Sequence, residues 1–143
     1  MRQLLLISVI AFLNVTAHSQ TADQLVEICV DGLGDATYLK DFQVEHAAAV
    51  PGQQAPVARY SMVLNKNTQY RLSICTSEGA SGKGIIQLFD NQGVVATNYV
   101  EDSDTYYSFF DVKIQSTGVY HIFISFKDGA PGTAVGVLSL VKR

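Results

Sequence analysis

Tryptophan is absent from this sequence of 143 residues, and proline occurs only three times, cysteine twice and histidine three times. Charged residues make up just 16%, and the net charge is −3. Because Lys and Arg form no cluster, nothing predicts binding to nucleic acid. No run of residues after the N-terminal segment reaches the roughly 20 apolar positions that cross a bilayer, so we expect no transmembrane segment in the mature chain.

Hydrophobic residues are plentiful, at 48% of the chain, and they favour a folded core over disorder. The length suits one domain, which we expect to cover 20–143. Seven Tyr and seven Phe favour β-structure, where aromatic side chains pack well on a pleated surface.

The N-terminus has the three-part layout of a secretory signal peptide. Arg2 supplies an early positive charge, 4–13 is almost unbroken apolar sequence, and a polar stretch follows in which Ala17 and Ser19 are small. This layout predicts a signal peptide over 1–19 and a secreted, periplasmic or cell-surface protein. A membrane anchor is the alternative, but the apolar run has only about half the length needed.

Both cysteines, Cys29 and Cys75, fall in the mature part of the chain. Export places them where thiols are oxidised, so we expect one disulfide between them. Two separate buried thiols are the alternative. A zinc site is disfavoured because no second Cys or His lies at ligand spacing from either residue.

Short apolar or alternating runs, each followed by Gly, Asn, Asp or Pro, recur along the mature chain and predict strands and turns. We find no helical periodicity after residue 20. About nine strands follow: 24–30, 37–45, 57–64, 69–76, 84–89, 94–99, 106–114, 119–127 and 134–141.

Most of these strands have one apolar and one mixed face, which predicts an all-β fold: two antiparallel sheets packed as a β-sandwich. The ranges 57–64 and 69–76, joined by a polar turn, make the best hairpin. Four residues should point into the layer between the sheets: Leu72, Ile74, Ile122 and Ile124.

Three stretches carry a family resemblance. They are the strand–turn–strand 60–74 with its turn Asn65-Lys66-Asn67-Thr68, the strand 86–93 ending in Asp90-x-x-Gly93, and the strand 116–124 with Gly118-x-Tyr120. Together they resemble the bacterial pre-peptidase C-terminal domain family. The resemblance covers 59–141 and implies a jelly-roll-like β-sandwich with a binding or structural role rather than catalysis. The N-terminal segment with Cys29 lies outside it.

Tyr120 follows a turn and alternates with apolar residues. We expect its hydroxyl to hydrogen-bond the nearby backbone, as in a tyrosine corner. A ligand contact is the alternative.

Catalytic residues are scarce. His46 and His121 are the only histidines after the signal peptide, and a Ser–His–acid set can be drawn from His121, Ser125 and Asp111. Because no nucleophile elbow or oxyanion-hole signature accompanies it, we expect no enzyme and no cofactor. A small secreted hydrolase remains the competing class.

An acidic loop holds Glu101, Asp102 and Asp104, whose carboxylates are ligands that calcium accepts. The loop lacks the spaced Asp-x-Asp-x-Asn/Asp-Gly pattern of a calcium site, so a solvated loop is the simpler interpretation.

Four aromatic residues bracket this loop and are the candidate ligand-binding site: Tyr99, Tyr106, Tyr107 and Phe109. Exposed aromatics beside carboxylates stack on sugar rings or anchor a protein partner. The alternative is that other parts of the chain cover them. The sequence therefore predicts an exported, non-catalytic binding or structural module for a glycan or an envelope or secreted protein, or else a subunit of a cell-envelope assembly.

Overall fold

The computed structural model describes residues 20–142. The predicted signal peptide over 1–19 lies outside these described residues. Within them, no helix is long and apolar enough to span a membrane.

The described chain begins with a helix, α1 (Ala22–Asp31), so the strand predicted over 24–30 is wrong. Thr21 caps the helix: its Oγ1 accepts a hydrogen bond from the Gln24 amide at 3.3 Å, and its own amide donates to Gln24 Oε1 at 3.0 Å. This reciprocal pair is a capping box, which satisfies two backbone donors at the start of the helix.

The apolar face of α1 explains why the helix forms. Leu25 and Cys29 lie four residues apart in α1 and are buried against Val135 and Val137 of a neighbouring strand, and Leu33, just after the helix, is buried with them. A spacing of four places side chains on one side of a helix. The β-branched residues between them, which favoured a strand prediction, lie to the side of this stripe or in solvent.

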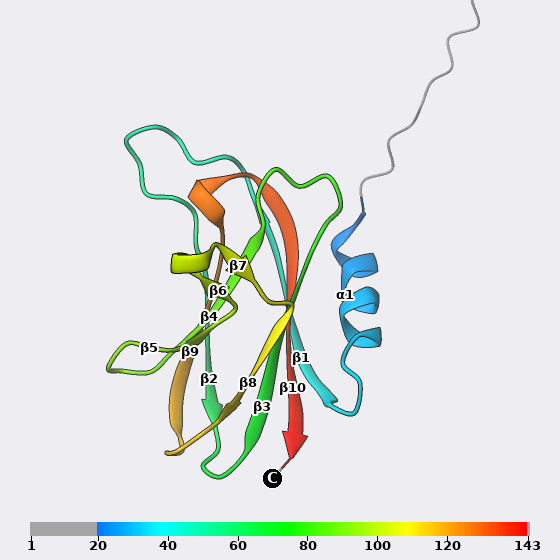
Figure 1. Ribbon diagram of the computed structural model, residues 1–143, viewed down its shortest axis with the longest axis vertical. Helices are drawn as coiled ribbons and strands as arrows, with labels where there is room; N and C mark the ends of the chain where they lie inside the picture. The colour runs from blue at the N-terminus through cyan, green and yellow to red at the C-terminus, as the bar shows by residue number, and fades with distance from the viewer. Residues whose placement is uncertain (1–19, 143) are drawn as a thin grey trace, which may run out of the picture.

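Two four-stranded antiparallel sheets follow (Figure 1). The first sheet has the spatial order β1 (Thr37–His46), β10 (Gly132–Lys142), β3 (Gln69–Thr76) and β8 (Phe109–Lys113). The second sheet has the order β2 (Ala58–Leu64), β9 (Gly118–Phe126), β4 (Gly84–Phe89) and β5 (Val94–Thr97). Successive strands mostly alternate between the sheets, which is the jelly-roll arrangement. The predicted antiparallel, jelly-roll-like sandwich is confirmed.

The predicted hairpin of 57–64 with 69–76 is wrong. These segments form β2 and β3, but β2 pairs with β9, whereas β3 pairs with β10 and β8 in the other sheet. Alternation reports which side chains face inward, but it does not identify the neighbouring strand.

The core lies between the two sheets. The four residues predicted to point into it are all buried there, which confirms the inward assignment: Leu72, Ile74, Ile122 and Ile124. Each such side chain contributes on the order of 1.5–3 kcal/mol through burial. Tyr120 is also buried, and its hydroxyl donates to the Ser116 carbonyl oxygen at 2.8 Å, as predicted.

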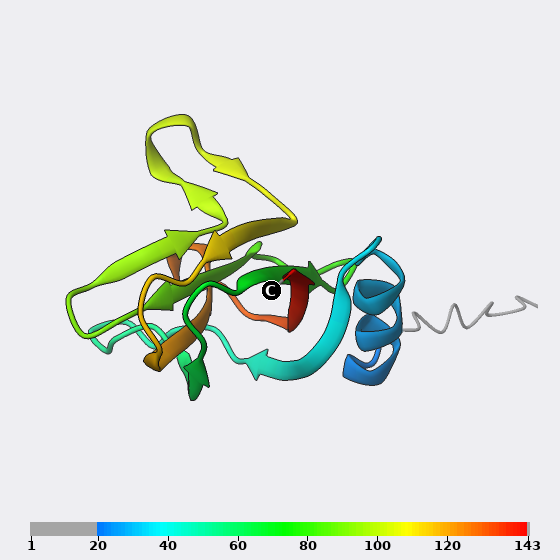
Figure 2. The ribbon, with the colours of Figure 1, turned by 90° about the horizontal axis from the view of Figure 1, so that it is seen from below.

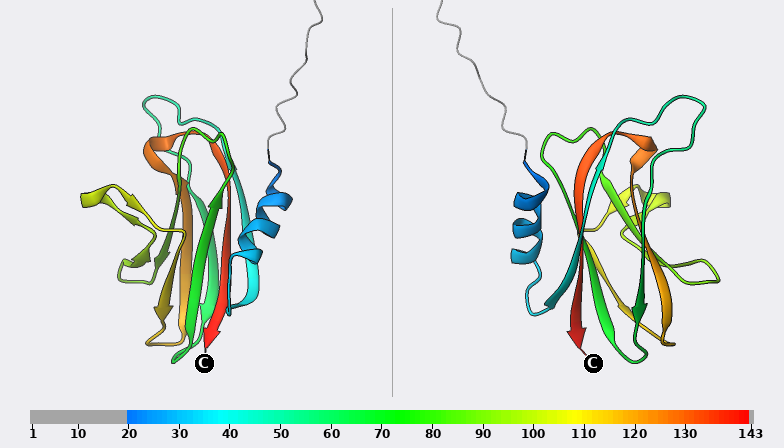
Figure 3. Two further views of the ribbon diagram at one scale, coloured as in Figure 1. Left: turned by 45° about the vertical axis from the view of Figure 1, so that its right-hand side comes forward. Right: turned by 180° about the vertical axis from the view of Figure 1, so that it is seen from behind.

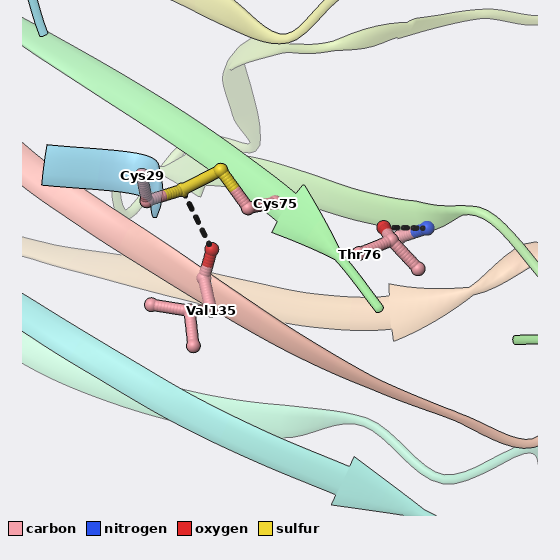
Figure 4. Close-up of a disulfide and its surroundings, with 5 residues drawn as sticks. Cys29, Cys75, Thr76 and Val135 are labelled. Atoms are coloured by element: carbon pink, nitrogen blue, oxygen red, sulfur yellow. Dashed lines mark hydrogen bonds between the residues drawn. A yellow bond between two sulfur atoms is a disulfide. The ribbon is translucent and has the colours of Figure 1, made fainter. Parts of the chain in front are cut away.

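The disulfide joins α1 to the first sheet. Cys29 and Cys75 are bonded, with 5.7 Å between their Cα atoms, as the sequence predicts. Figure 4 shows the bond beside β10, where the carbonyl oxygen of Val135 lies 3.6 Å from Cys29 Sγ. The helix therefore covers the outer face of the first sheet, and within residues 20–142 no α-helix covers the outer face of the second (Figure 3).

A small hairpin interrupts the chain between β5 and β8. It consists of β6 (Tyr99–Val100), a 3₁₀ turn η1 (Glu101–Ser103) and β7 (Thr105–Tyr106). We call residues 99–106 the arm. The strands predicted over 94–99 and 106–114 both continue into it and are broken at its base. The arm stands away from both sheets (Figure 2).

Candidate functional site

The base of the arm is held by one buried polar residue, Asn98, which is 1% exposed. Its Oδ1 accepts from the Ile86 amide at 2.8 Å, and its Nδ2 donates to the carbonyl oxygens of Gly84 at 3.3 Å and Tyr107 at 3.1 Å. The Tyr107 amide donates in turn to the Asn98 carbonyl oxygen at 2.8 Å. The two ends of the arm are thus bonded to each other and to β4.

Two tyrosines form the inner side of the arm. Tyr99 and Tyr106 are opposite each other in the hairpin, and their rings stack with centroids 4.6 Å apart at 30°. The Tyr99 hydroxyl donates to Asp104 Oδ1 at 3.0 Å. Offset stacking of this kind adds roughly 0.5–1.5 kcal/mol to the burial of the two rings.

Two lysines from the body of the domain brace these rings. Lys127 Nζ lies 4.7 Å from the centre of the Tyr99 ring and donates to the Tyr99 hydroxyl at 2.8 Å. That hydrogen bond raises the pKa of Lys127, so the ammonium stays charged. Lys83 Nζ lies 4.9 Å from the centre of the Tyr106 ring. Cations over aromatic faces are attracted by about 0.5–1 kcal/mol at exposed sites.

The acidic residues lie at the tip of the arm. Glu101 and Asp102 are exposed in η1, and Asp104 has a left-handed backbone with φ 45°. Within residues 20–142, no group of three His, Cys, Asp or Glu residues is placed to hold a metal ion. The geometry therefore presents the carboxylates of Glu101 and Asp102 to solvent.

The four predicted aromatic residues do not form one cluster. Tyr99 and Tyr106 brace the arm and are only partly exposed, whereas Tyr107 is 56% exposed and lines a shallow groove of about 270 Å³ beside Tyr106. Phe109 is 43% exposed on the outer face of the first sheet. The structure thus separates two bracing residues from two exposed ones.

Phe109 belongs to a different constellation, centred on Arg71. The Arg71 guanidinium carbon lies 4.1 Å from the centre of the Phe109 ring. Its nitrogens donate to Asp111 at 2.7 and 2.9 Å and to the Leu33 carbonyl oxygen at 3.1 Å. The hydrogen bond from Arg71 lowers the pKa of Asp111. These contacts tie the segment after α1 to β8, which is a structural role.

The triad drawn from the sequence is not assembled. His121 lies in β9 of the second sheet, and its Nδ1 is 2.7 Å from Ser61 Oγ. Asp111 lies in the first sheet and pairs with Arg71. Ser125 and Asp111 are therefore not brought together with His121 as a catalytic triad.

Sequence reasoning missed Asn98, Lys83 and Lys127. Asn98 follows a β-strand as an ordinary turn residue would, and only its burial reveals its role. The lysines are distant in sequence from the tyrosines that they contact. The one available signal was the position of Asn98 directly before the aromatic and acidic segment.

Fold and site together define an antiparallel jelly-roll β-sandwich with a braced arm between its fifth and sixth long strands. Among solved structures, the chain is similar to PliG of Aeromonas hydrophila, a periplasmic lysozyme inhibitor of g-type lysozyme. The TM-score is 0.53 at 11% identity, over 73% of this chain and 87% of PliG.

The pre-peptidase C-terminal domain of the collagenase of Bacillus anthracis is also similar, with a TM-score of 0.48 at 14% identity over 71% of this chain and 89% of that domain. It belongs to the family that the sequence motifs resemble. At these identities the likeness is one of fold. No family model matches the sequence, and no curated protein matches it either.

Proposed function

We propose that this protein is an exported, non-catalytic module that binds a protein partner through the arm. The observation that carries the proposal is the bracing of residues 99–106: hydrogen bonds close the base, and two lysines hold the stacked tyrosines. A loop held in one conformation loses little entropy when it binds, so more of its contact energy becomes affinity.

The chemistry of the tip indicates the kind of partner. Glu101 and Asp102 are exposed, and no described side chain pairs with them. Two uncompensated carboxylates on a projecting loop complement a basic surface or cleft, and such complementarity mainly raises association rate and specificity. The partner that fits is a basic protein with a recess for the arm.

The comparison with PliG supports this class of function. PliG is described as an inhibitor of a lysozyme, and it has a similar fold. Fold alone does not transfer a function, so g-type lysozyme serves here as the first probe rather than as the assigned partner.

Export is supported by two observations. The segment 1–19 has the layout of a secretory signal, and the disulfide between Cys29 and Cys75 is of the kind that persists in oxidising compartments. PliG, with a similar fold, is described as periplasmic.

Reversing the charge of the tip tests the proposal. The double variant Glu101→Lys with Asp102→Lys should keep the melting temperature, because both side chains are exposed, and should weaken binding more than tenfold. A matched control places the same charge change on α1, through Glu27→Lys with Asp31→Lys, which are also exposed. The first measurement is inhibition of g-type lysozyme by the wild type and both variants.

A second measurement covers partners other than that enzyme. The three proteins are used side by side to capture material from the exported fraction of the native cell. A basic protein retained by the wild type and the α1 control, but not by the tip variant, supports the proposal. Equal capture by all three, or none by any, together with no inhibition, refutes binding through the tip.

A glycan ligand is the second candidate function, because Tyr107 is exposed beside a groove. For this function Tyr107→Ala should lower retention on a glycan array without changing the melting temperature. Loss of both together would show that the ring is structural.

A further inference from the structure

One cleft of the described chain lies far from the arm. It has a volume of about 610 Å³ and opens at the end of the sandwich where β2 turns into β3, which is the end seen in Figure 2. Its floor consists of the buried core residues Leu64, Tyr70 and Leu138. Its rim includes Leu39, which is 45% exposed, and Met62. An apolar recess that reaches the core from solvent is the usual form of a small-molecule site.

The position of the cleft follows from the topology. β1 is one edge strand of the first sheet and β2 is one edge strand of the second. The two lie on the same side of the sandwich, since the rings of Phe42 in β1 and Tyr60 in β2 have centroids 4.6 Å apart. The pairing of β1 with β10 shifts register between Tyr38 and Lys40, so Leu39 has no opposite residue. Such a bulge bends the edge strand and changes the direction of its side chains. The two sheet edges therefore do not close over the core here.

A cation lies at the mouth of this cleft. Lys40 pairs with Leu138 in the ladder between β1 and β10. It alternates in phase with the buried Phe42 and Val44, so it lies on the strand face that is turned toward the core. The side chain is exposed, its Nζ is 5.7 Å from the centre of the Phe42 ring, and it lines the cleft. No salt bridge of residues 20–142 involves Lys40. An apolar recess thus carries an uncompensated positive charge at its entrance.

We propose that this cleft binds a single-chain amphiphile with an anionic head group, such as a fatty acid. The hydrocarbon chain lies along Leu39, Met62 and Leu138, and the carboxylate pairs with Lys40. The volume falls within the roughly 300–1,000 Å³ typical of small-molecule sites. The proposal is independent of the arm, which connects β5 to β8 at the opposite edges of the two sheets.

The absence of tryptophan provides a direct assay. Leu39→Trp places a single indole at the rim of the cleft. Leu39 is exposed, so the larger ring fits there without disturbing the core. Dodecanoate below its micelle concentration should shift the emission of this variant to the blue as the ring loses water. Ile28→Trp, on the exposed side of α1 at 49%, is the matched control and should show no shift. In the unmodified protein, calorimetry should detect the same binding.

Chain length and head group then separate the proposal from surface adsorption. Affinity should rise about two- to fourfold per added methylene until the cleft is filled, and then level off. Dodecyltrimethylammonium should bind at least tenfold more weakly than dodecanoate, and Lys40→Glu should reverse that order.

Equal shifts at both tryptophans, or a charge preference unchanged by Lys40→Glu, would overturn the proposal. So would no binding by calorimetry, which would leave Lys40 as a charge that protects an edge strand from pairing with other chains. None of these results would affect binding through the arm.

Discussion

Asn98 shows how one buried polar side chain supports an exposed loop. It bonds the buried amide of Ile86 and the buried carbonyl oxygen of Gly84, which water does not easily reach, and also the part-buried carbonyl oxygen of Tyr107. A buried group left unpaired costs about 1–3 kcal/mol. The residue therefore stabilises the domain and the base of the arm together.

Replacing Asn98 should be far more damaging than its position in a connection suggests. We expect Asn98→Ala to lower the free energy of unfolding by about 2–4 kcal/mol, measured by urea denaturation. Asn98→Asp keeps the shape but turns two donated hydrogen bonds into repulsion between oxygens, so it should also destabilise at neutral pH. Asn91→Ala, in an exposed turn, is the control and should be nearly neutral. A similar small effect at both positions would contradict this role.

His46 gives the fold a dependence on pH. Its ring packs edge-on against Phe126, with centroids 5.7 Å apart, and its Nδ1 is buried without a hydrogen-bond partner among the described residues. Burial lowers the pKa of His46 below 6.5, its value in the unfolded chain. As the pH falls through 6.5, the unfolded chain therefore binds a proton more readily, and stability falls.

This contribution is measured by comparing urea midpoints at pH 7.5 and 5.5. The wild type should lose stability over that interval, and His46→Gln, which cannot take up a proton, should lose less. An equal loss in both proteins would assign the pH dependence to other groups.

At the scale of elements, α1 was the main error of sequence interpretation. Val26, Ile28 and Val30 are strand-favouring residues, and in a window of seven residues they outweighed the four-residue spacing of Leu25 and Cys29. Tertiary packing favours the helix, because Val135 and Val137 on the outer face of the first sheet bury the apolar face of α1. The capping box at Thr21 was the local signal that would have identified the helix start.

The disulfide holds that helix in place. It closes a loop with a sequence separation of 46, for which the chain-entropy account gives about 4 kcal/mol. Cys29→Ala with Cys75→Ala should therefore unfold at clearly lower urea concentration. Hydrogen exchange should show α1 losing protection first, while β9 and β4 stay protected. The reduced wild-type protein is the control and should behave like the double variant; a stable α1 in both would show that apolar packing alone suffices.

At the scale of the whole molecule, alternation along the chain predicted the sandwich and the inward faces of β3 and β9. It did not predict strand order, because a strand has the same alternation of buried and exposed residues whichever strand it pairs with. The sequence did not predict that Phe109 lies apart from Tyr99 and Tyr106 either. The two tyrosines contact lysines, and Phe109 contacts an arginine, and these cations come from segments distant in the sequence. Local chemistry marked this segment as a candidate site, and long-range packing determines which contacts each of its residues makes.

The jelly roll should fold without its arm. The ends of the arm are bonded through the Tyr107 amide and the Asn98 carbonyl oxygen at 2.8 Å, a spacing that a two-residue turn spans. Replacing 99–106 with Asn-Gly, a sequence favoured in tight hairpins, should leave both sheets intact. We expect the stacking, the cation contacts and the exposed hydrogen bonds of the Tyr99 hydroxyl to be lost, about 1–3 kcal/mol in total, which lowers the melting temperature by about 3–15 °C.

The same deletion should abolish binding that depends on the tip while leaving dodecanoate binding at the cleft unchanged. Circular dichroism and a melting curve check the first expectation, and the two binding assays check the second. A deletion variant that fails to fold would show that the arm belongs to the folding unit rather than to a surface added to it. Because β5 and β8 are edge strands of their sheets, the arm is inserted at the margin of the sandwich and not between two central strands.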